Sequence, residues 1–311
     1  MTALNRVSVI VCTFNRSHLL AEMLQSAAEL AAPTSWELLI VDNNSSDQTQ
    51  KVAAGFKQRL PIRYIFESRQ GQSIALNRGI LESEGDLLLF CDDDVRLEPD
   101  WLLNYAKAAK EDPRPGWFGG RVLALWPNAK PTWLWNESIP ALSGHIVNYD
   151  LGADCRLYDS KDKIPIGASM GLRRSTIEKI GLYREDLGPR GDRRGAGGDT
   201  DLIERAINSG IPGYYVGSAV CHHWVHPDRL KVRSFFDYGV SKGFNQYLSG
   251  ADEFRPCSFS RIADQLVRSV PQVLKNRGDR ARICLVNIGI EIGRLKARQA
   301  KSQNAAAKKS L

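Results

Sequence analysis

The sequence lacks the features that mark secreted, membrane-spanning and zinc-binding proteins. Its six cysteines are scattered over 311 residues without a CxxC pair, which argues against both a disulfide framework and a zinc cluster. No charged opening segment leads into an apolar stretch, and no run of about 18 strongly apolar residues occurs, so neither a signal peptide nor a spanning helix is expected. These absences favour a cytoplasmic protein that is not integral to a membrane.

An excess of positive charge is absent from most of the chain. Residues 270–311 hold ten Lys and Arg against Asp279 and Glu291, a balance of 10 − 2 = +8, which leaves −1 of the net +7 for residues 1–269. A nucleic-acid enzyme more often carries a basic groove through its body, so no nucleic acid is expected as a partner.

Strand-like and helix-like segments alternate through the body of the chain, whose 43% hydrophobic content permits a large core. Apolar and β-branched runs predict strands over residues 7–14, 36–41, 62–66, 87–91, 117–125 and 214–220. Helical periodicity predicts helices after Ser17 and over 74–81, 99–110, 176–180 and 202–208. Short connections between alternating elements predict an α/β fold with a doubly wound, mostly parallel sheet.

Local signals refine this expectation at three places. Ser17 can cap the helix after the first strand, and Ser45 and Gln48 have the spacing of a capping box. Regular structure is also expected over residues 164–172, after a long irregular stretch.

Three consecutive carboxylates follow an apolar strand. Residues 87–91 form a continuous apolar run, and Asp92, Asp93 and Asp94 come where that run ends. Alternation sends Asp92 and Asp94 to one side of an extended chain and Asp93 to the other, so Asp92 and Asp94 can share Mg²⁺ or Mn²⁺. The alternative is a solvated acidic turn before the helix that starts near Pro99.

Three further stretches carry candidate functional residues. Residues 126–163 are rich in Trp and Pro and predict a long loop, whose aromatic residues could hold a sugar or lipid or could pack on the sheet. Residues 188–198 are rich in Gly and Arg and end at Asp199, which suggests an active-site lid or a plain helix N-cap. The strand at 214–220 leads into His222, His223 and His226, which could complete a site begun at Asp94.

The chain from residue 231 onward is expected to be helical, with disorder over 299–311. In the last helix Asn287, Glu291, Arg294 and Arg298 form one stripe, and apolar residues cover the remainder. This helix could pack on the rest of the protein, or the basic residues within 270–311 could lie against anionic lipid headgroups.

Six motifs in order resemble those of a family 2 glycosyltransferase with the GT-A fold. They are Thr13-Phe14-Asn15-Arg16, residues 41–47, residues 71–79, Asp92-Asp93-Asp94, residues 167–170 and residues 197–202. The resemblance spans residues 7–245, and six ordered motifs are far more specific than one.

The resemblance implies inverting transfer of one sugar from a nucleotide-diphosphate sugar, with a UDP-sugar favoured, to a hydroxyl of a glycan or lipid-linked acceptor. It implies a nucleotide-sugar site formed by Thr13, Asn15, Arg16, Asp42, Asn44, Gln72, Asn77, Arg78, Asp92 and Asp93. It implies Mn²⁺ or Mg²⁺ held by Asp94, Asp92 and His223, with His222 as the fallback. Asp199 would be the general base. Gly167, Ser169 and Trp133 are the candidate acceptor contacts.

Departures from the family pattern leave some roles open. Gly198 stands where relatives usually have Glu, so Asp201 could be the base instead of Asp199. Ser169 stands where Asn is common, and the absence of a Gln-x-x-Arg-Trp motif disfavours a processive polysaccharide synthase. A nucleotidyltransferase and a non-catalytic nucleotide-sugar-binding module are the alternatives. The first would need a Gly-rich loop after strand 1, and the intact candidate residues speak against the second.

The expected organisation is a catalytic domain over residues 1–230 with a basic helical extension over 231–311. A nucleotide-sugar half would cover about 1–125 and an acceptor half about 126–230. The extension could hold a cytoplasmic enzyme at the inner face of the cell membrane.

Overall fold

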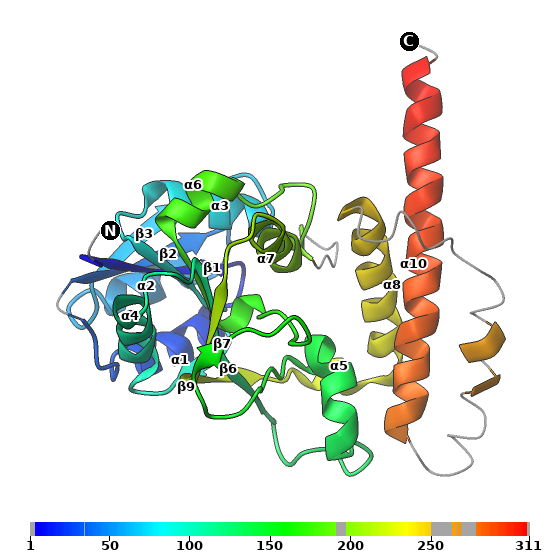
Figure 1. Ribbon diagram of the computed structural model, residues 1–311, viewed down its shortest axis with the longest axis horizontal. Coiled ribbons are helices and arrows are strands. Elements are labelled where there is room, and N and C mark those ends of the chain that lie inside the picture. The colour runs from blue at the N-terminus through cyan, green and yellow to red at the C-terminus, as the bar shows by residue number, and fades with distance from the viewer. Residues whose placement is uncertain are drawn as a thin grey trace. The chain divides into compact units, whose positions relative to one another are not determined.

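The computed structural model describes residues 4–33, 35–190, 197–249, 263–265, 267–268 and 278–309. They form two compact units (Figure 1). Unit 1 consists of residues 1–125, 147–186 and 198–224, and unit 2 consists of residues 126–146, 187–197 and 225–311. Each unit is therefore assembled from segments that lie far apart in the sequence.

Unit 1 is built on a nine-stranded sheet in the order β3-β2-β1-β4-β8-β6-β9-β5, with β7 paired to β9. The strands are β1 (Val7–Thr13), β2 (Trp36–Asp42), β3 (Ile62–Phe66), β4 (Leu87–Phe90), β5 (Val95–Leu97), β6 (Trp117–Leu125), β7 (Arg156–Leu157), β8 (Met170–Arg173) and β9 (Gly213–Trp224). Strands β3, β2, β1 and β4 are parallel, as the alternation of strands and helices predicts. The sheet as a whole is mixed, because β8 is antiparallel to both β4 and β6.

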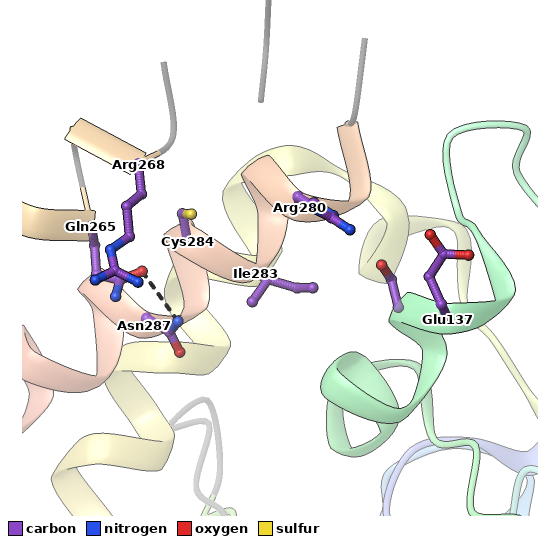
Figure 2. Close-up of a pocket in the computed structure, with 8 residues that line it drawn as sticks. Glu137, Gln265, Arg268, Arg280, Ile283, Cys284 and Asn287 are labelled. Atoms are coloured by element: carbon purple, nitrogen blue, oxygen red, sulfur yellow. Dashed lines mark hydrogen bonds between the residues drawn. The ribbon is translucent and has the colours of Figure 1, made fainter. Parts of the chain in front are cut away.

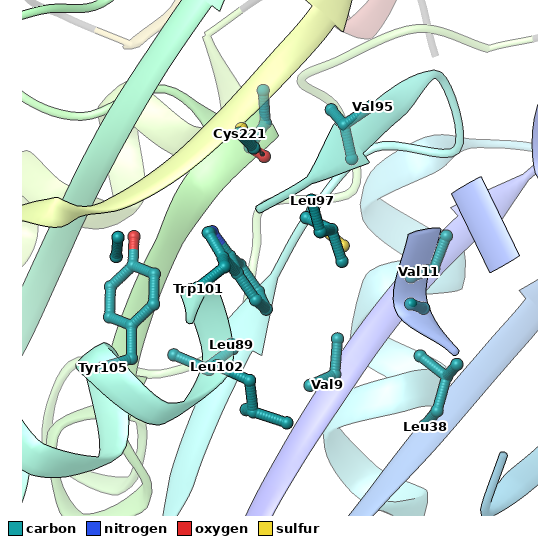
Figure 3. Packing of buried hydrophobic residues seen from close by; sticks show 14 of the residues in the cluster. Val9, Val11, Leu38, Leu89, Val95, Leu97, Trp101, Leu102, Tyr105 and Cys221 are labelled. Carbon is teal, nitrogen blue, oxygen red and sulfur yellow. Dashed lines mark hydrogen bonds between the residues drawn. The ribbon is translucent and has the colours of Figure 1, made fainter. Parts of the chain in front are cut away.

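Helices cover both faces of this sheet. They are α1 (Ser17–Ala27), α2 (Thr49–Gly55), α3 (Gln72–Glu82), α4 (Trp101–Glu111), α6 (Arg174–Ile180) and α7 (Gly198–Asn208), with a short 3₁₀ turn η2 (Gly167–Ser169). Alternate strand residues point to opposite faces, so neighbours in one strand belong to different cores. Val9 packs with Leu102 and Trp101 on one face (Figure 3). Ile10 packs on the other face, in the core that includes Ile80 and Leu202.

Two expected helix caps are wrong. Helices α1 and α2 begin at Ser17 and Thr49, and neither has a side-chain cap from its N-cap residue. The Asp47 carboxylate instead accepts hydrogen bonds from the backbone N–H groups of Ser17 (2.8 Å) and Thr49 (3.0 Å). One carboxylate thus serves two helix starts that approach each other only in the folded sheet, which the local spacing of Ser45 and Gln48 could not reveal.

The segments expected to be irregular contain more structure than their composition suggested. Within 126–163 the chain forms η1 (Asn136–Ser138), α5 (Ile139–Ile146) and β7. The segment 164–172 forms strand only from Met170. Residues 191–196 of the expected lid lie outside the described residues.

Unit 2 is helical. Besides η1 and α5 it contains η3 (Pro227–Leu230), α8 (Val232–Ser249) and α10 (Gly278–Lys309), and its core includes Leu142, Phe235 and Val286. Because α10 continues to Lys309, the expected disorder over 299–311 is wrong up to that residue. The last turns are rich in Ala, Lys and Gln, which favour helix. In the part of the chain that the structure describes, no helix combines the length and apolarity needed to cross a membrane.

Helices α8 and α10 approach each other through glycines. A Cβ added at Gly239 or Gly243 of α8 would overlap the α10 backbone, and one added at Gly289 or Gly293 of α10 would overlap the α8 backbone. Glycines four residues apart lie on one face of a helix, so each helix presents a smooth surface to the other. Val286 and Ile288 of α10 are buried. The apolar surface of α10 is therefore covered within unit 2.

Candidate active site

The three carboxylates lie at the carboxyl end of β4, where the chain turns into the short strand β5. Strand β5 pairs antiparallel with the end of β9, and this register sets His223 opposite Val95. The backbone N–H of Trp224 donates to the carbonyl of Asp94 at 2.9 Å. The pairing of β5 with β9 therefore brings His223 beside the acidic run from which it is far removed in sequence.

Asp92, Asp94 and His223 form a compact group of possible metal ligands. His223 Nε2 lies 3.0 Å from Asp94 Oδ1 and 3.5 Å from Asp92 Oδ2. One ligand atom from each of the three residues lies within 4.8 Å of the others. His223 Nδ1 lies 2.9 Å from the carbonyl oxygen of Trp224, so an N–H at Nδ1 leaves Nε2 to face the carboxylates. Two carboxylates and an imidazole are a donor set that fits a divalent cation.

The charges in this group depend on one another. Burial by itself would lower the pKa of His223, but the adjacent Asp94 and Asp92 carboxylates outweigh it and raise the pKa to about 9. Without another cation, His223 is therefore an imidazolium at neutral pH. A cation that uses Nε2 as a ligand has to replace that proton.

Asp93 lies outside this group of possible ligands. It is buried, accepts a hydrogen bond from the Thr13 hydroxyl at 2.7 Å, and lies 3.1 Å from Nη1 of Arg16. Burial raises the pKa of Asp93 to about 7, although Arg16 opposes the shift. Asp93 thus ties the end of β1 to the end of β4.

A small pocket of unit 1 contains the carboxyl groups of both Asp92 and Asp199. It is lined by Cys12, Gln72, Leu76, Phe90, Cys91, Asp92, Gly167, Tyr183 and Asp199. Helix α7 begins at Gly198, so Asp199 lies inside its first turn and is not a plain N-cap. A Cβ at position 167 would overlap the Asp199 carboxylate, so Gly167 gives this group its room. Burial, with the charge of Asp92, raises the pKa of Asp199 to about 6.

Asp201 has different surroundings, although it lies on the same turn of helix. Its carboxylate pairs with Arg205 at 2.9 Å and with Arg184 at 3.7 Å. The Asp201 carboxylate is therefore already bound by two guanidinium groups.

Tyr183 is a site residue that sequence reasoning missed. It is buried beside Asp199, and its ring packs edge-on against Phe90 at 5.9 Å between centroids. The Asn77 side chain donates to the Tyr183 carbonyl and accepts from the Tyr183 N–H, both at 2.9 Å. Asn77, expected at the nucleotide, therefore has its amide engaged in holding Tyr183. Nothing in the sequence near Tyr183 marks it, because its partners come from distant segments.

The loops after β1 and β2 are linked by side-chain hydrogen bonds near Asp42. Asp42 is buried and accepts from the Tyr64 hydroxyl at 2.6 Å and from the Ser45 N–H at 2.8 Å. Asn15 Oδ1 accepts from the Ser46 N–H at 2.8 Å. Asn44 is exposed with a φ of 70°, a conformation that Asn tolerates better than most residues.

Asn43, which sequence reasoning passed over, orders the next loop instead. Its Oδ1 accepts from the Gly71 N–H at 2.7 Å, and its Nδ2 donates to the Arg69 carbonyl at 2.8 Å. Gly71 precedes α3, whose first residue, Gln72, lines the pocket. The run of two asparagines in the motif was the available signal, but it did not show which of them is buried.

Several expected site residues are placed elsewhere. Arg78 is exposed and pairs with Glu82 at 2.8 Å. His222 points away from His223 along the strand and pairs with Glu98 at 2.7 Å, so it is not part of the ligand group. Ser169 is fully buried, accepts from Trp101 Nε1–H at 2.9 Å and bonds the Tyr105 hydroxyl at 2.9 Å, which does not support a contact with the acceptor.

Trp133 belongs to unit 2 and has a packing partner there. The Arg282 guanidinium lies 3.8 Å from its ring centroid, and Phe235 packs edge-on at 5.8 Å. Such a stacked cation is a stabilising contact for an indole ring. The ring is thus accounted for by packing, which was the alternative to a sugar or lipid contact.

A larger cavity, about 570 Å³ in volume, lies within unit 2 (Figure 2). It is lined by Glu137, Ser138, Gln265, Arg268, Arg280, Ile283, Cys284 and Asn287. Asn287 donates to Gln265 at 3.2 Å, and Arg268 pairs with Asp264 at 2.8 Å. Asn287 thus bonds another residue of the cavity, whereas the smaller pocket of unit 1 brings together the carboxyl groups of Asp92 and Asp199.

A comparison against protein families identifies the family of this chain. Residues 8–181, more than half of the chain, match the family described as glycosyl transferase family 2. The chain belongs to glycosyl transferase family 2. As a family 2 glycosyltransferase it is a transferase, and the nucleotidyltransferase and non-catalytic alternatives are set aside.

Named relatives support the same assignment, and a solved structure shows the fold. The chain is 26% identical over 242 residues to glycosyltransferase AglE of Haloferax volcanii, which covers 75% of this chain and 71% of that protein. It is 26% identical over 160 residues to dodecaprenyl-phosphate galacturonate synthase of Rhizobium johnstonii, with coverages of 49% and 47%. The mannosyltransferase PcManGT of Pyrobaculum calidifontis, solved with GDP-Man and Mn²⁺, superposes with a TM-score of 0.55 at 19% identity, over 98% of this chain and 81% of that one. The GT-A fold expected from the motifs is confirmed.

Proposed function

We propose that this family 2 glycosyltransferase moves one sugar from a nucleotide-diphosphate sugar to a hydroxyl of a glycan or lipid-linked acceptor, with inversion at the anomeric carbon. The observation that carries the proposal is the partly buried Asp199 carboxyl in the same pocket as Asp92. A proton acceptor and an acidic site for a metal-bound diphosphate would then flank one reacting centre. A lipid-linked acceptor is in keeping with the polyprenyl phosphate in the name of the Rhizobium relative.

Asp199 is the general base in this proposal. Its carboxylate takes the proton of the acceptor hydroxyl while the hydroxyl oxygen bonds to the anomeric carbon. The bond from that carbon to the diphosphate oxygen breaks, and its electron pair leaves with the nucleoside diphosphate. One displacement of this kind inverts the carbon. A pKa of about 6 suits the task, because the group is ionised at neutral pH yet more basic than an ordinary aspartate.

The donor site lies along the carboxyl ends of β1, β2 and β4 in this proposal. Asp42 would accept a hydrogen bond from the base, with Thr13, Asn15 and Arg16 beside the nucleotide and Gln72 near the sugar. A UDP-sugar remains the favoured donor. The proposed donor site does not include Asn44, Asn77 or Arg78. Asn77 holds Tyr183, Arg78 pairs with Glu82, and Asn44 is exposed.

Asp92, Asp94 and His223 would hold the divalent cation. Carboxylates suit both Mg²⁺ and Mn²⁺, and the imidazole favours Mn²⁺. The bound cation would supply Lewis-acid stabilisation of the negative charge on the leaving diphosphate. His223 keeps its place in either charge state through the contact of Nδ1 with the Trp224 carbonyl.

Each segment of the chain has its own function in this proposal. Residues 1–125 bind the nucleotide sugar, residues 126–230 contribute to the acceptor side, and residues 231–311 form a basic helical extension. Arg280, Lys296 and Arg298 are exposed on α10 and could face an anionic membrane surface at the inner side of the cell membrane. Arg282 and Arg294 are excluded from that surface, because they bind Trp133 and Glu291.

A donor screen followed by base variants tests the proposal. UDP-, GDP- and dTDP-sugars are compared by thermal shift with and without Mn²⁺, where a ligand at a hundredfold its dissociation constant adds ~2.7 kcal/mol. With the donor found, Asp199→Asn should keep donor affinity and lose transfer by about 10²–10⁴-fold. Asp201→Asn is the matched control and should lower stability more than turnover, because it weakens the pair with Arg205. Reversed effects of the two variants would reassign the base.

A further inference from the structure

Arg16 supplies positive charge to the carboxylates that a divalent cation would use. It is the N-cap residue of α1, and its Nη1 lies 3.1 Å from Asp93 Oδ1 and 3.2 Å from Asp94 Oδ2. The Asp94 carboxylate therefore contacts both the Arg16 guanidinium and His223, which is another of the possible metal ligands.

The geometry of this contact allows Arg16 to leave the two carboxylates. A single nitrogen bridges two carboxylates, and the parallel two-bond arrangement that makes an arginine pair strong is not formed. The Arg16 side chain is 47% exposed, whereas those of Asp93 and Asp94 are 5% and 8% exposed. Asp93 also has the Thr13 hydroxyl as a second partner. Arg16 can thus swing into solvent while the carboxylates stay in place.

A cation bound to Asp94 changes the balance of charge at Arg16. The cation repels the guanidinium and takes over one of its two anionic partners. A diphosphate that arrives with the cation offers the planar guanidinium a better, bidentate partner. Arg16 therefore weakens binding of the cation alone and strengthens binding of the cation together with the diphosphate.

We propose that Arg16 is an exchangeable counter-ion that makes cation and diphosphate binding cooperative: it competes with the cation for Asp94 and is released to the diphosphate when both bind. This inference rests on the proposed metal-dependent donor site. Coupling of this kind is reciprocal, so the diphosphate should raise affinity for the cation by the same factor as the cation raises affinity for the diphosphate.

Calorimetric titration of the full chain at one fixed pH tests the inference with Mn²⁺ alone, inorganic pyrophosphate alone, and each in the presence of the other. Wild type should bind Mn²⁺ weakly alone and about tenfold or more tightly with pyrophosphate. Arg16→Ala should bind Mn²⁺ alone about tenfold more tightly than wild type and show little coupling. Arg16→Lys should keep the weak binding of Mn²⁺ alone, because it keeps the charge.

Arg59→Ala is the matched control, since Arg59 is 46% exposed and pairs with Glu29 on another part of unit 1. It removes the same charge and should leave Mn²⁺ binding unchanged. Equal Mn²⁺ affinity and equal coupling in wild type and Arg16→Ala, with both folded by circular dichroism, overturn the role of Arg16 while leaving the metal site intact. Failure of wild type to bind Mn²⁺ under any condition overturns the metal-dependent site and the exchange together.

Discussion

Two aspartates two positions apart on α7 show how surroundings divide chemical roles between identical side chains. Asp199 is partly buried beside Asp92 without a guanidinium partner among the contacts the structure gives it, and its pKa is raised to about 6. Asp201 is buried, and its carboxylate pairs with Arg205 and Arg184. Because two guanidinium groups already bind the Asp201 carboxylate, we assign the proton transfer to Asp199.

The raised pKa of Asp199 predicts the pH profile of transfer. A general base works only when ionised, so kcat/KM should fall about tenfold per pH unit below pH of about 6. A kcat/KM that stays constant through pH of about 6 would contradict the assignment of Asp199 as the base.

Asp94 is the residue on which cation binding should depend most. Asp94→Ala removes a carboxylate that lies between His223 and Arg16, and metal-dependent donor binding should be lost while the fold is kept. Isothermal titration with donor and Mn²⁺ measures the loss. His222→Ala is the control and should bind normally, because His222 pairs with Glu98. If Asp94→Ala binds donor normally in the presence of EDTA, the cation assignment is wrong.

At the scale of elements, α8 and α10 pack through glycines on both sides of their contact. Gly243 of α8 meets the backbone of α10 at Ile290, and Gly293 of α10 meets α8 at Val240 and Phe244. Such an approach leaves no room for a methyl group. Glycine usually weakens a helix interior, so its place here reflects packing between helices.

Substitution at this contact should therefore reverse the usual effect of alanine. Gly243→Ala should lower the free energy of unfolding of unit 2 by about 1–3 kcal/mol, because the added methyl overpacks the contact. Gly55→Ala in α2 is the control, since nothing lies within 4 Å of a Cβ there, and it should be neutral or stabilising by up to about 1 kcal/mol. Urea denaturation with hydrogen exchange in α8 and α10 measures both. Equal stability of Gly243→Ala and wild type would show that the helices can move apart at little cost.

At the scale of the whole molecule, the basic tail is partly internal structure. Asp279 is buried and accepts from the Ser138 hydroxyl at 2.6 Å, Glu291 pairs with Arg294, and Arg282 stacks on Trp133. Removing residues 270–311 would expose the core of unit 2, so truncation is not a clean test of lipid binding. Charge substitution at exposed positions is the better test.

Neutralising the exposed tail charges should weaken binding to anionic liposomes. The triple variant Arg280→Gln, Lys296→Gln and Arg298→Gln removes three positive charges that each contribute ~1 kcal/mol near such a surface, so binding should fall by about a hundredfold at low salt. Lys51→Gln, Lys57→Gln and Lys110→Gln together remove the same charge from exposed positions of unit 1 and serve as the control. Flotation with liposomes measures both. Equal flotation of the two triple variants would remove the tail surface from the proposal.

The sequence by itself determined the α/β class, the family and the position of the acidic run. These follow from local patterns, because strand alternation, apolar runs and ordered motifs are written in neighbouring residues. Alternation also predicted that Asp92 and Asp94, rather than Asp93, could share a cation.

Only the tertiary structure decided which side chains meet. The pairing of β5 with β9 selects His223 over His222, the guanidinium groups at Asp201 distinguish it from Asp199, and Asn77 turns out to hold Tyr183. The reason is that burial and charge compensation arise from segments distant in sequence, and they set pKa values and partners that no local spacing records. The same holds for α10, whose glycines have meaning only against α8.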